Sequence, residues 1–491
     1  MDERTGPESR YEHSHAPTAN AVLPTALRLD ADERYTGKGV TIAFLDSGFT
    51  PHPDLTLPES RIAAYADITG DGAPLAPDGP PEGWRWHGTQ TSVSAAGNGR
   101  LSDGYYAGLA RNARVVLGKV SRAGKIAEED IAAGIRWVLE RKDELGIRIV
   151  SISLGGDVDV PYETNVVDRA AEDAIAKGLV VVVAAGNSGL AEDPRTVPPG
   201  NSPSVVTVGG YDDQNTLYTA PKDLYHSNYG PTADGVLKPE IIAPAQWVAA
   251  PILLGTPSEE KALALCELAE AEDFQYLKRA ERLARVAGLD PALLSTSARE
   301  IRKAVARLLR QSKTVAAHYQ HVDGTSFAAP VVASVVAQML EANPRLSPAA
   351  VKHLLISTAD RLPGASAVRQ GYGVVNAKRA VEEATHEHHV LGDHVFSPPR
   401  VGGGRIVFTH HDEHATSMAI AGDFNGWDGG ATPMTRDGHG VFEVAIEPPG
   451  LGRLAYKYVV DGTRWIEDPD NGLKEPDGYG GFNSIVNLAA K

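Results

Sequence analysis

The amino-acid sequence predicts an α/β domain with a central parallel sheet flanked by helices, a helical insertion within it, and a separate all-β sandwich after it. Apolar β-branched runs alternate with amphipathic helical runs between residues 36 and 381, as in a parallel sheet covered on both faces. Residues of about 255–320 are rich in Ala, Leu, Glu, Lys and Arg and contain few strand formers. From residue 405 onward, short alternating segments are separated by Gly, Asp and Asn turns, a pattern typical of a sandwich.

Length, charge and cysteine content narrow the classes of protein to consider. A chain of 491 residues is long enough for two to four domains. Because 63 acidic residues outnumber 47 basic ones, for a net charge of −16, we expect neither nucleic acid nor a membrane surface as partner. The single cysteine, Cys266, excludes an internal disulfide and a cysteine-based metal site. Residues 1–35 are a polar leader without the apolar region of a secretory signal, so we expect a cytoplasmic protein.

The elements of the α/β domain follow from the periodicity of its apolar residues. The expected strands are nearly continuous β-branched runs at 40–45, 115–120, 147–154, 179–184 and 205–208. Helical spacing of apolar residues predicts helices over 126–141 and 162–177. In the insertion, Ser258 followed by two glutamates predicts a helix start, and Gly288 with Pro291 predicts a break before a helix ending near Arg310. This insertion is either surface decoration or a lid on a substrate cleft.

Residues 382–404 are interpreted as a linker, because they combine charge, a Pro-Pro pair and a triple glycine. Seven histidines lie in and after it, at positions 386, 388, 389, 394, 410, 411 and 414. Without an HExxH arrangement or cysteines, solvated side chains are a better interpretation than metal ligands. The sandwich then occupies residues 405–491.

Three separate segments together predict a nucleophile. Asp46 ends the first strand, where open α/β sheets build their sites, and His87 opens a helix of small residues. Ser326 begins an apolar helix, so its backbone N–H and the positive helix end point to where an oxyanion would form. Each feature alone is weak. A serine hydroxyl, however, needs an imidazole to remove its proton, and the imidazole needs a carboxylate to orient it.

Eight motifs make the resemblance specific: FLDSG, HGT, SLGG, AAGNSG, SNYGP, KPEIIAP, GTSFAAP and GYGVVNA. In this order they are similar to those of subtilisin-like serine proteases, over about residues 36–381. The resemblance implies the subtilase fold, with Asp46 orienting the base, His87 as general base and acid, and Ser326 as nucleophile. It also implies that Asn187 donates a side-chain hydrogen bond to the oxyanion.

The same resemblance implies substrate contacts and a possible metal ligand. Ser153, Leu154 and Gly155 match the edge strand that pairs with substrate backbone. At the floor of the first specificity pocket, either Val197 or Pro198 replaces a glycine, which predicts small or medium apolar residues before the scissile bond. Asp54 matches a calcium ligand of many relatives, but no matching calcium loop is recognisable in residues 98–106. We therefore expect no required cofactor and leave calcium open.

The short leader is similar to that of intracellular subtilisins, in which such a segment occupies the cleft. Leu23 and Pro24 are the residues that would do so here. A disordered terminus is the simpler interpretation.

The sandwich has a resemblance of its own, carried by GDFNGWDGG, AYKYVVDGTRWIEDP and GGFNSIV. These segments resemble the glycogen- or starch-binding modules of the early-set sandwich type found in branching enzymes. The resemblance implies a surface of two stacking tryptophans with a lysine and an asparagine, on which the matching residues are Trp427, Lys457, Trp465, Tyr479 and Asn483. The alternative is a contact or spacer domain with both tryptophans in its core.

Taken together, the sequence predicts a cytoplasmic serine endopeptidase that hydrolyses protein or peptide substrates through an acyl-enzyme intermediate, without a redox or nucleotide cofactor. Its C-terminal module would direct it to an α-glucan or to a protein partner. Two alternatives remain open: a catalytically silent scaffold that binds glycogen, and a processing protease dedicated to one partner protein.

Overall fold

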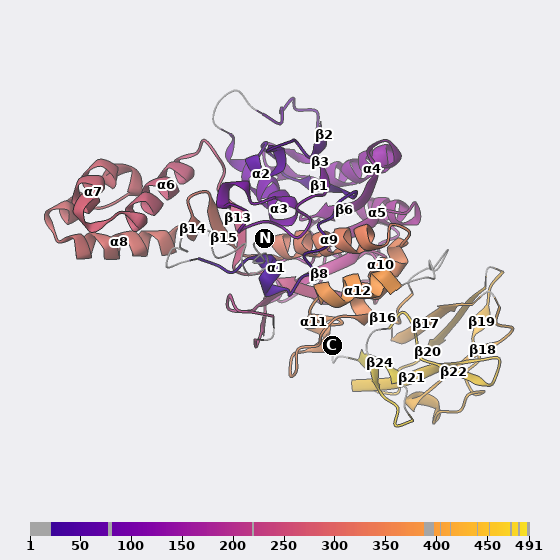
Figure 1. The fold of residues 1–491 in the computed structure, drawn as a ribbon. Helices are drawn as coiled ribbons and strands as arrows, with labels where there is room; N and C mark the ends of the chain where they lie inside the picture. The colour runs from indigo at the N-terminus through magenta and orange to yellow at the C-terminus, as the bar shows by residue number, and fades with distance from the viewer. Residues whose placement is uncertain are drawn as a thin grey trace, which may run out of the picture.

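The computed structural model describes residues 21–76, 81–218, 220–386 and 397–488, except for 403, 413, 439, 451, 472–473 and 480–481. Figure 1 shows an α/β domain in the centre, a helical block projecting from one side of it, and a β-rich domain at another side. The predicted fold class is confirmed.

A parallel sheet forms the centre of the α/β domain. Its strand order is β12-β8-β7-β6-β1-β3-β2, and every neighbouring pair in this order is parallel. The short β9 adds to β8 in the antiparallel direction. The strands are β1 Thr41–Asp46, β2 Ile62–Asp67, β3 Arg114–Lys119, β6 Ile147–Ile152, β7 Val180–Ala184, β8 Val206–Asp212, β9 Asp223–Leu224 and β12 Ile241–Pro244. The carboxyl end of β1 places Asp46 at the edge of the sheet.

Helices cover both faces of this sheet, as the continuous apolar strands predict. One face carries α3 (Trp86–Ala96), α9 (Thr325–Ala342), α10 (Pro348–Ser357) and α12 (Ala377–His386), and the other carries α4 (Glu128–Leu145) and α5 (Val166–Ala176). Of the described helices, α9 is long and apolar enough to cross a membrane by composition. Because 83% of that apolar window is buried inside the protein, α9 serves as the core helix of the domain.

The insertion grows out of an antiparallel pair of strands, β13 (Val248–Pro251) and β15 (Tyr319–Val322), which β14 (Thr314–Ala316) extends. It contains α6 (Pro257–Glu270), α7 (Asp273–Ala287), the 3-10 helix η4 (Pro291–Ser295) and α8 (Ala298–Gln311). Thr256, not Ser258, caps α6, because Pro257 takes the first helical position. A second break at residues 271–272 separates α6 from α7 and was not predicted. The helices enclose an apolar core of their own, distinct from the two cores of the central sheet.

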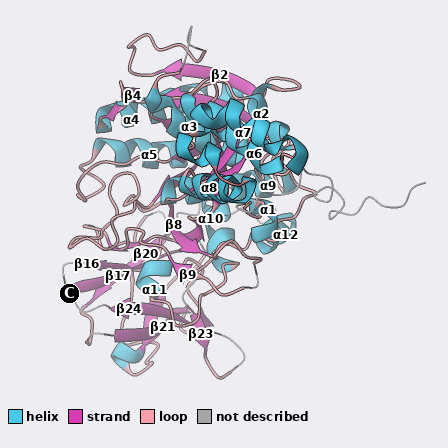
Figure 2. Ribbon diagram, turned by 90° about the vertical axis from the view of Figure 1, so that its left-hand side faces the viewer, coloured by secondary structure: helices cyan, strands magenta, loops and turns pink. Residues whose placement is uncertain are grey.

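Two antiparallel sheets form the C-terminal sandwich around one apolar core. The first has the order β16-β17-β20-β19, and the second has the order β18-β21-β24-β23 with β22 paired to β21. Their strands are β16 Arg400–Gly402, β17 Arg405–His411, β18 Met418–Gly422, β19 Thr435–Arg436, β20 Val441–Ile446, β21 Gly452–Val460, β22 Arg464–Ile466, β23 Lys474–Pro476 and β24 Phe482–Leu488. Figure 2 shows these strands below the helices of the α/β domain.

Two parts of the expected linker are regular structure. Helix α12 continues through residue 386, because Ala380, Val381 and Ala384 remain on its buried side. The strand β16 pairs with β17 before residue 405. Histidines 388, 389 and 394 lie outside the described residues.

The remaining elements are short. They are α1 Thr25–Arg28, α2 Pro53–Thr56, α11 Ala367–Gln370, β4 Ser121–Arg122, β5 Lys125–Ile126, β10 Gly230–Pro231, β11 Leu237–Lys238, and the 3-10 helices η2 Gly83–Arg85, η3 Arg100–Ser102 and η5 Asp423–Asn425.

Candidate active site

The aspartate and the histidine predicted for the site are hydrogen-bonded to each other. Asp46 ends β1 and His87 lies in the first turn of α3, and His87 Nδ1 lies 2.8 Å from Asp46 Oδ1. The same carboxylate oxygen accepts the Ser47 N–H at 2.6 Å, and Oδ2 accepts the Thr91 hydroxyl at 2.9 Å. Since Asp46 is buried, these bonds fix its orientation and thereby that of the imidazole. Sequence reasoning missed Thr91, although it lies one helical turn after His87.

The imidazole is set up to accept a proton. Burial of the His87 ring opposes its protonation, but the charge of Asp46 and its hydrogen bond outweigh burial, so the pKa of His87 is raised above its ordinary value of 6.5. The ring keeps 18% of its side-chain surface exposed, which leaves it accessible from solvent. This combination suits a general base that carries a proton only during the reaction.

Ser326 lies in the first turn of α9, directly after a sharp turn of the chain. Gly324 has φ of +135°, a conformation in which a side chain would be strained, and its N–H donates to Ala245 O at 2.7 Å. The Phe327 ring lies 5.8 Å from the His87 ring, so the start of α9 is next to the imidazole. Ser326 Oγ lies 3.5 Å from Ser153 O. Among the described residues, the side chains of His87 and Ser326 are not hydrogen-bonded to each other. Catalytic hydrogen bonds are often formed only when substrate is bound.

Asn187, the predicted oxyanion donor, is hydrogen-bonded to Thr325, the residue directly before Ser326. Asn187 Oδ1 accepts the Thr325 N–H at 2.9 Å and the Thr325 hydroxyl at 3.1 Å. Because the oxygen is occupied in this way, the amide NH₂ of Asn187 remains as the group that can donate to a substrate. Thr325 also accepts the Gly186 N–H, so it connects the two loops. The sequence analysis did not identify Thr325 as this orienting residue.

Val197, and not Pro198, is the side chain next to Gly155 of the expected substrate-binding segment. A methyl group built on Gly155 would lie 3.1 Å from Val197 Cγ2, whereas Pro198 approaches Gly155 only with its carbonyl oxygen. Val197 is partly exposed and Pro198 is buried. Ser153 hydroxyl donates to Ser326 O at 2.8 Å, and Leu154 packs on the core beneath. Residues 153–155 follow the end of β6 and are not part of a strand here, which corrects the expected edge strand, and Ser153 contacts Ser326.

The surroundings of Asp54 do not fit the calcium ligand that the resemblance suggested. Its side chain is buried, Oδ2 accepts the Tyr319 hydroxyl at 2.7 Å, and Oδ1 accepts the Leu101 N–H at 3.2 Å. Both oxygens thus face hydrogen-bond donors, not a cation. Within the described part of the chain, no three His, Cys, Asp or Glu side chains gather as a metal would require.

Leu23 and Pro24 lie on the α/β domain. Leu23 N–H donates to Asn215 Oδ1 at 2.7 Å, and Pro24 caps α1. The preceding Val22 is buried in an apolar cluster with Tyr106 and Tyr319. At these two described residues the disordered terminus is therefore corrected, and their role as cleft occupant stays a prediction.

On the sandwich, four of the five predicted carbohydrate residues share one sheet face. Tyr456 and Tyr458 of β21 point into the core, so Lys457 between them points outward. By the same alternation Asn483 of β24 lies outward, next to the buried Ser484. These two residues share the outer face with Trp427 and Trp465, as described next.

Trp465 pairs with Val459 and is 43% exposed, and Trp427 packs on the outer residues Ala421 and Val459. Both tryptophans lie outside the sandwich core, contrary to the spacer-domain alternative. Tyr479 is 96% exposed in the turn after β23, and the Lys457 amine lies 2.6 Å from Asp477.

A carboxylate–imidazole pair near a serine at a helix start, with an oriented amide, is the set of groups that serine peptidases use. A family model described as the subtilase family matches residues 37–373, and the chain belongs to this family. A second model, carbohydrate-binding module 48 (isoamylase N-terminal domain), matches residues 390–476, which places the sandwich with these modules.

The relatives that the chain matches are named as proteases. Serine protease AprX of Bacillus subtilis is 33% identical over 355 residues, which cover 70% of this chain and 67% of AprX. An extracellular protease of Xanthomonas campestris is 27% identical over 72% of this chain and 53% of its own length. Among solved structures, proteases from Pseudoalteromonas arctica match 74% of this chain and 95% of their own, with 23% identity and a TM-score of 0.48.

Proposed function

We propose that this chain is a serine endopeptidase in which Asp46, His87 and Ser326 form the catalytic triad. His87 takes the Ser326 hydroxyl proton as the oxygen attacks the peptide carbonyl, and Asp46 stabilises the imidazolium that forms. The oxyanion receives hydrogen bonds from the Asn187 NH₂ and the Ser326 N–H. His87 then protonates the leaving amine, and water hydrolyses the acyl-enzyme by the same steps in reverse.

The observation that carries this proposal is the buried hydrogen bond of 2.8 Å between Asp46 and His87. Both carboxylate oxygens of Asp46 also accept hydrogen bonds from other groups, the Ser47 N–H and the Thr91 hydroxyl. A structural histidine at a helix start has no need of a carboxylate that is itself held by two further donors. The NH₂ of Asn187, left unoccupied when Thr325 binds its oxygen, supplies the second element of a hydrolytic site.

Labelling with a fluorophosphonate probe tests the proposal, because the probe reacts only with an activated serine. The full chain should be labelled and should cleave a peptide substrate, while Ser326→Ala should do neither. Ser334→Ala is the matched control, since Ser334 is a buried serine of the same helix that donates to Val331 O. Labelling of the Ser326→Ala chain would overturn the assignment, and absence of labelling in the wild type would favour the silent scaffold.

We further propose that the sandwich binds an α-glucan on the outer face that carries Trp427, Lys457, Trp465 and Asn483. Exposed indole faces stack on the apolar faces of glucose rings, and an amide can bind hydroxyl groups. Affinity electrophoresis in glycogen should retard the chain, and Trp465→Ala should abolish this retardation. Trp137→Ala, in α4 of the other domain, should leave it unchanged. Equal mobility of the wild type with and without glycogen would contradict glucan binding.

A processing protease dedicated to one partner is favoured over a general degrader by one observation, the Val197 side chain that narrows the space beside Gly155. Comparison of protein termini from cells that express the wild type or Ser326→Ala would distinguish the two. Few new termini, all after small apolar residues, would support dedicated processing, whereas many diverse termini would contradict it.

We also propose that the protein acts in the cytoplasm. Its single thiol, Cys266, is buried and has a pKa raised by burial to about 12, so it favours neither oxidation nor disulfide formation. Recovery of the tagged protein from a secreted fraction would contradict this localisation.

A further inference from the structure

The outer face of the sandwich that carries the carbohydrate residues is also the face that the protease domain contacts. Ala455 and Ile485 lie opposite each other on β21 and β24, on this outer face, and both are buried. Two aromatic residues cover them: Trp427 from the sandwich and Tyr372 from the protease domain. The ring of Tyr372 therefore adjoins the same apolar patch as one of the predicted stacking tryptophans.

Local backbone geometry fixes the position of Tyr372. Gly371 has φ of +58°, and a methyl group built on it would lie 2.1 Å from Pro239 O, so only glycine fits before the tyrosine. Tyr372 N–H donates to Glu240 O at 2.7 Å, and its hydroxyl lies 3.4 Å from Asp470 O of the sandwich. The Glu240 carboxylate is itself buried between Lys238 and Lys352. Tyr372 thus contacts the sandwich from a segment whose backbone position is fixed by Gly371 and by the hydrogen bond to Glu240 O.

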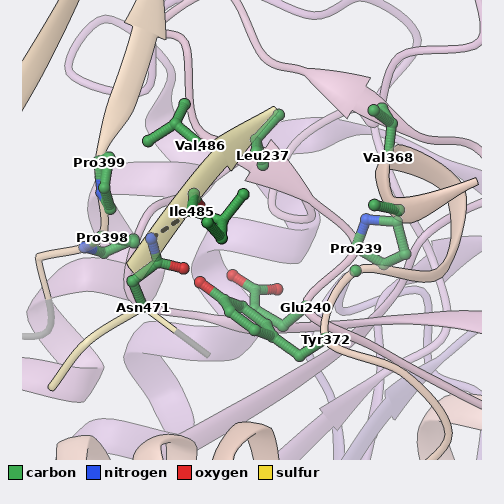
Figure 3. A pocket seen from close by; sticks show the side chains of 12 residues that line it. Leu237, Pro239, Glu240, Val368, Tyr372, Pro398, Pro399, Asn471, Ile485 and Val486 are labelled. Carbon is green, nitrogen blue, oxygen red and sulfur yellow. Dashed lines mark hydrogen bonds between the residues drawn. The ribbon is translucent and has the colours of Figure 1, made fainter. Parts of the chain in front are cut away.

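Tyr372 also remains partly exposed, along a pocket between the two domains. Figure 3 shows Tyr372, Glu240 and Pro239 on the protease side and Ile485, Asn471 and Pro398 on the sandwich side. The pocket has a volume of only about 30 Å³, too little for a sugar ring, so a sugar reaches Tyr372 at the exposed part of its ring and not inside the pocket. The pocket shares Ile485 with the patch beneath Trp427.

We propose that the α-glucan site is composite, and that Tyr372 of the protease domain is part of it. This inference rests on the proposed glucan binding by the sandwich. A short glucan occupies the tryptophan surface alone, and a longer one extends past Trp427, whose ring covers Ile485, and stacks on the exposed part of Tyr372. Because a long glucan then contacts both domains, its binding also stabilises their docking against each other.

Chain-length dependence of binding tests the composite site, since it separates contact with Tyr372 from general damage. Calorimetric titrations would use the full chain with Ser326→Ala, to prevent self-cleavage, and the probes maltotriose and maltoheptaose. We expect maltoheptaose to bind at least fivefold more tightly than maltotriose. Adding Tyr372→Ala should remove this gain and leave maltotriose within twofold, while Tyr372→Phe should keep it. Tyr65→Ala, on β2 at the far edge of the central sheet, is the control.

The outcomes distinguish the two proposals. An unchanged gain in Tyr372→Ala, while Trp465→Ala abolishes binding of both glucans, would overturn the composite site and leave glucan binding intact. An equal loss for both glucans in Tyr372→Ala would also overturn it, because that result indicates undocking of the sandwich. Absence of binding by the parent chain would overturn glucan binding itself.

Discussion

At the scale of single residues, the environment of His87 determines how the site responds to pH. Asp46 raises the pKa of His87 despite burial, so the ring is protonated, and the base inactive, at a higher pH than for an ordinary histidine. Activity should therefore rise with pH through a midpoint above 6.5. In the Ser326→Ala background, NMR titration should show that Asp46→Asn lowers this pKa, since burial then acts alone. An unchanged or higher pKa in Asp46→Asn would contradict the assigned pair.

Thr91 is a positioning residue whose contribution can be measured separately. Thr91→Val removes one hydrogen bond to the Asp46 carboxylate while it preserves side-chain volume. A hydrogen bond to a charged group contributes about 1.5–3 kcal/mol, so kcat should fall by about tenfold or more with KM unchanged. Thr89→Val, on the same helix, removes bonds to Thr50 and Arg85 instead and should keep kcat within about twofold. Equal effects of the two variants would indicate a role in folding alone.

Val197 should set the preference for the residue before the scissile bond. Val197→Gly removes the side chain that contacts Gly155 and so enlarges the pocket. We expect kcat/KM for a peptide with Phe at this position to rise about tenfold relative to the peptide with Ala. A peptide series differing only at this position measures the ratio. If the wild type already cleaves both peptides equally, the pocket lies elsewhere.

The sequence alone named Asp46, His87, Ser326 and Asn187 as candidates, because their residue types and motif order carry the chemistry, and their roles stay predictions. It was not sufficient to find Thr91 or Thr325. Their hydroxyls act through contacts made by folding, and a threonine in a small-residue helix is otherwise unremarkable in pattern. The sequence left calcium at Asp54 open for a similar reason: the Tyr319 hydroxyl that reaches Asp54 lies 265 residues away in the chain.

At the scale of elements, the helical insertion forms a unit with its own core. Its helices enclose Leu265, Tyr276 and Ile301, which do not belong to the cores of the central sheet. The insertion is attached through the paired strands β13 and β15. The strand β13 is joined to α3, the helix that carries His87, because the Gln90 amide donates to Pro251 O at 2.8 Å. The contacts between β13, β15 and α3 therefore lie outside the inserted helices.

Replacing residues 257–311 by a short Gly/Ser linker should leave hydrolysis of small peptides within about threefold, because β13, β15 and Gln90 remain. If the insertion is a lid, the same variant should cleave folded proteins faster than the wild type does. Parallel assays with a peptide and a folded substrate measure both effects. Loss of peptide hydrolysis, in a variant that still unfolds cooperatively, would show that the insertion supports the site directly.

Elements were predicted well where the pattern was long and uniform, as for β6, β7 and α5. The strand β2 was missed because its alanine-rich sequence is only half-buried at the sheet edge. The strand β12 was missed because it ends in proline, which discourages a strand assignment. The break between α6 and α7 carries neither glycine nor proline, so only the packing of the three helices determines it.

At the scale of the whole molecule, a buried acidic group lies where the sandwich meets its neighbour. Asp468 is buried in the sandwich and accepts hydrogen bonds from the Tyr456 and Tyr458 hydroxyls at 2.6 and 3.1 Å. Asp470 beside it accepts the Ser397 N–H, and its carbonyl faces Tyr372 of the protease domain. Burial, together with the charge of Asp470, raises the pKa of Asp468 to about 7.

A raised carboxyl pKa means that the folded state holds a proton which the unfolded chain releases. Its stabilising contribution is full below the ordinary pKa near 3.8 and is lost as pH rises through about 7. Between pH 6 and 8 the sandwich should lose about 5 °C in unfolding temperature. Asp468→Asn should flatten this dependence, and the exposed Asp428→Asn should not. Calorimetry measures all three chains, and a steeper dependence in Asp468→Asn would contradict the assignment.

The paired strands beneath the insertion have a practical consequence. Because β13 and β15 are paired at the point where the inserted helices leave the domain, this junction can accept another inserted protein. A fluorescent protein, whose termini lie near each other, could be inserted at this junction. It would then report the location of the enzyme from a position close to Ser326.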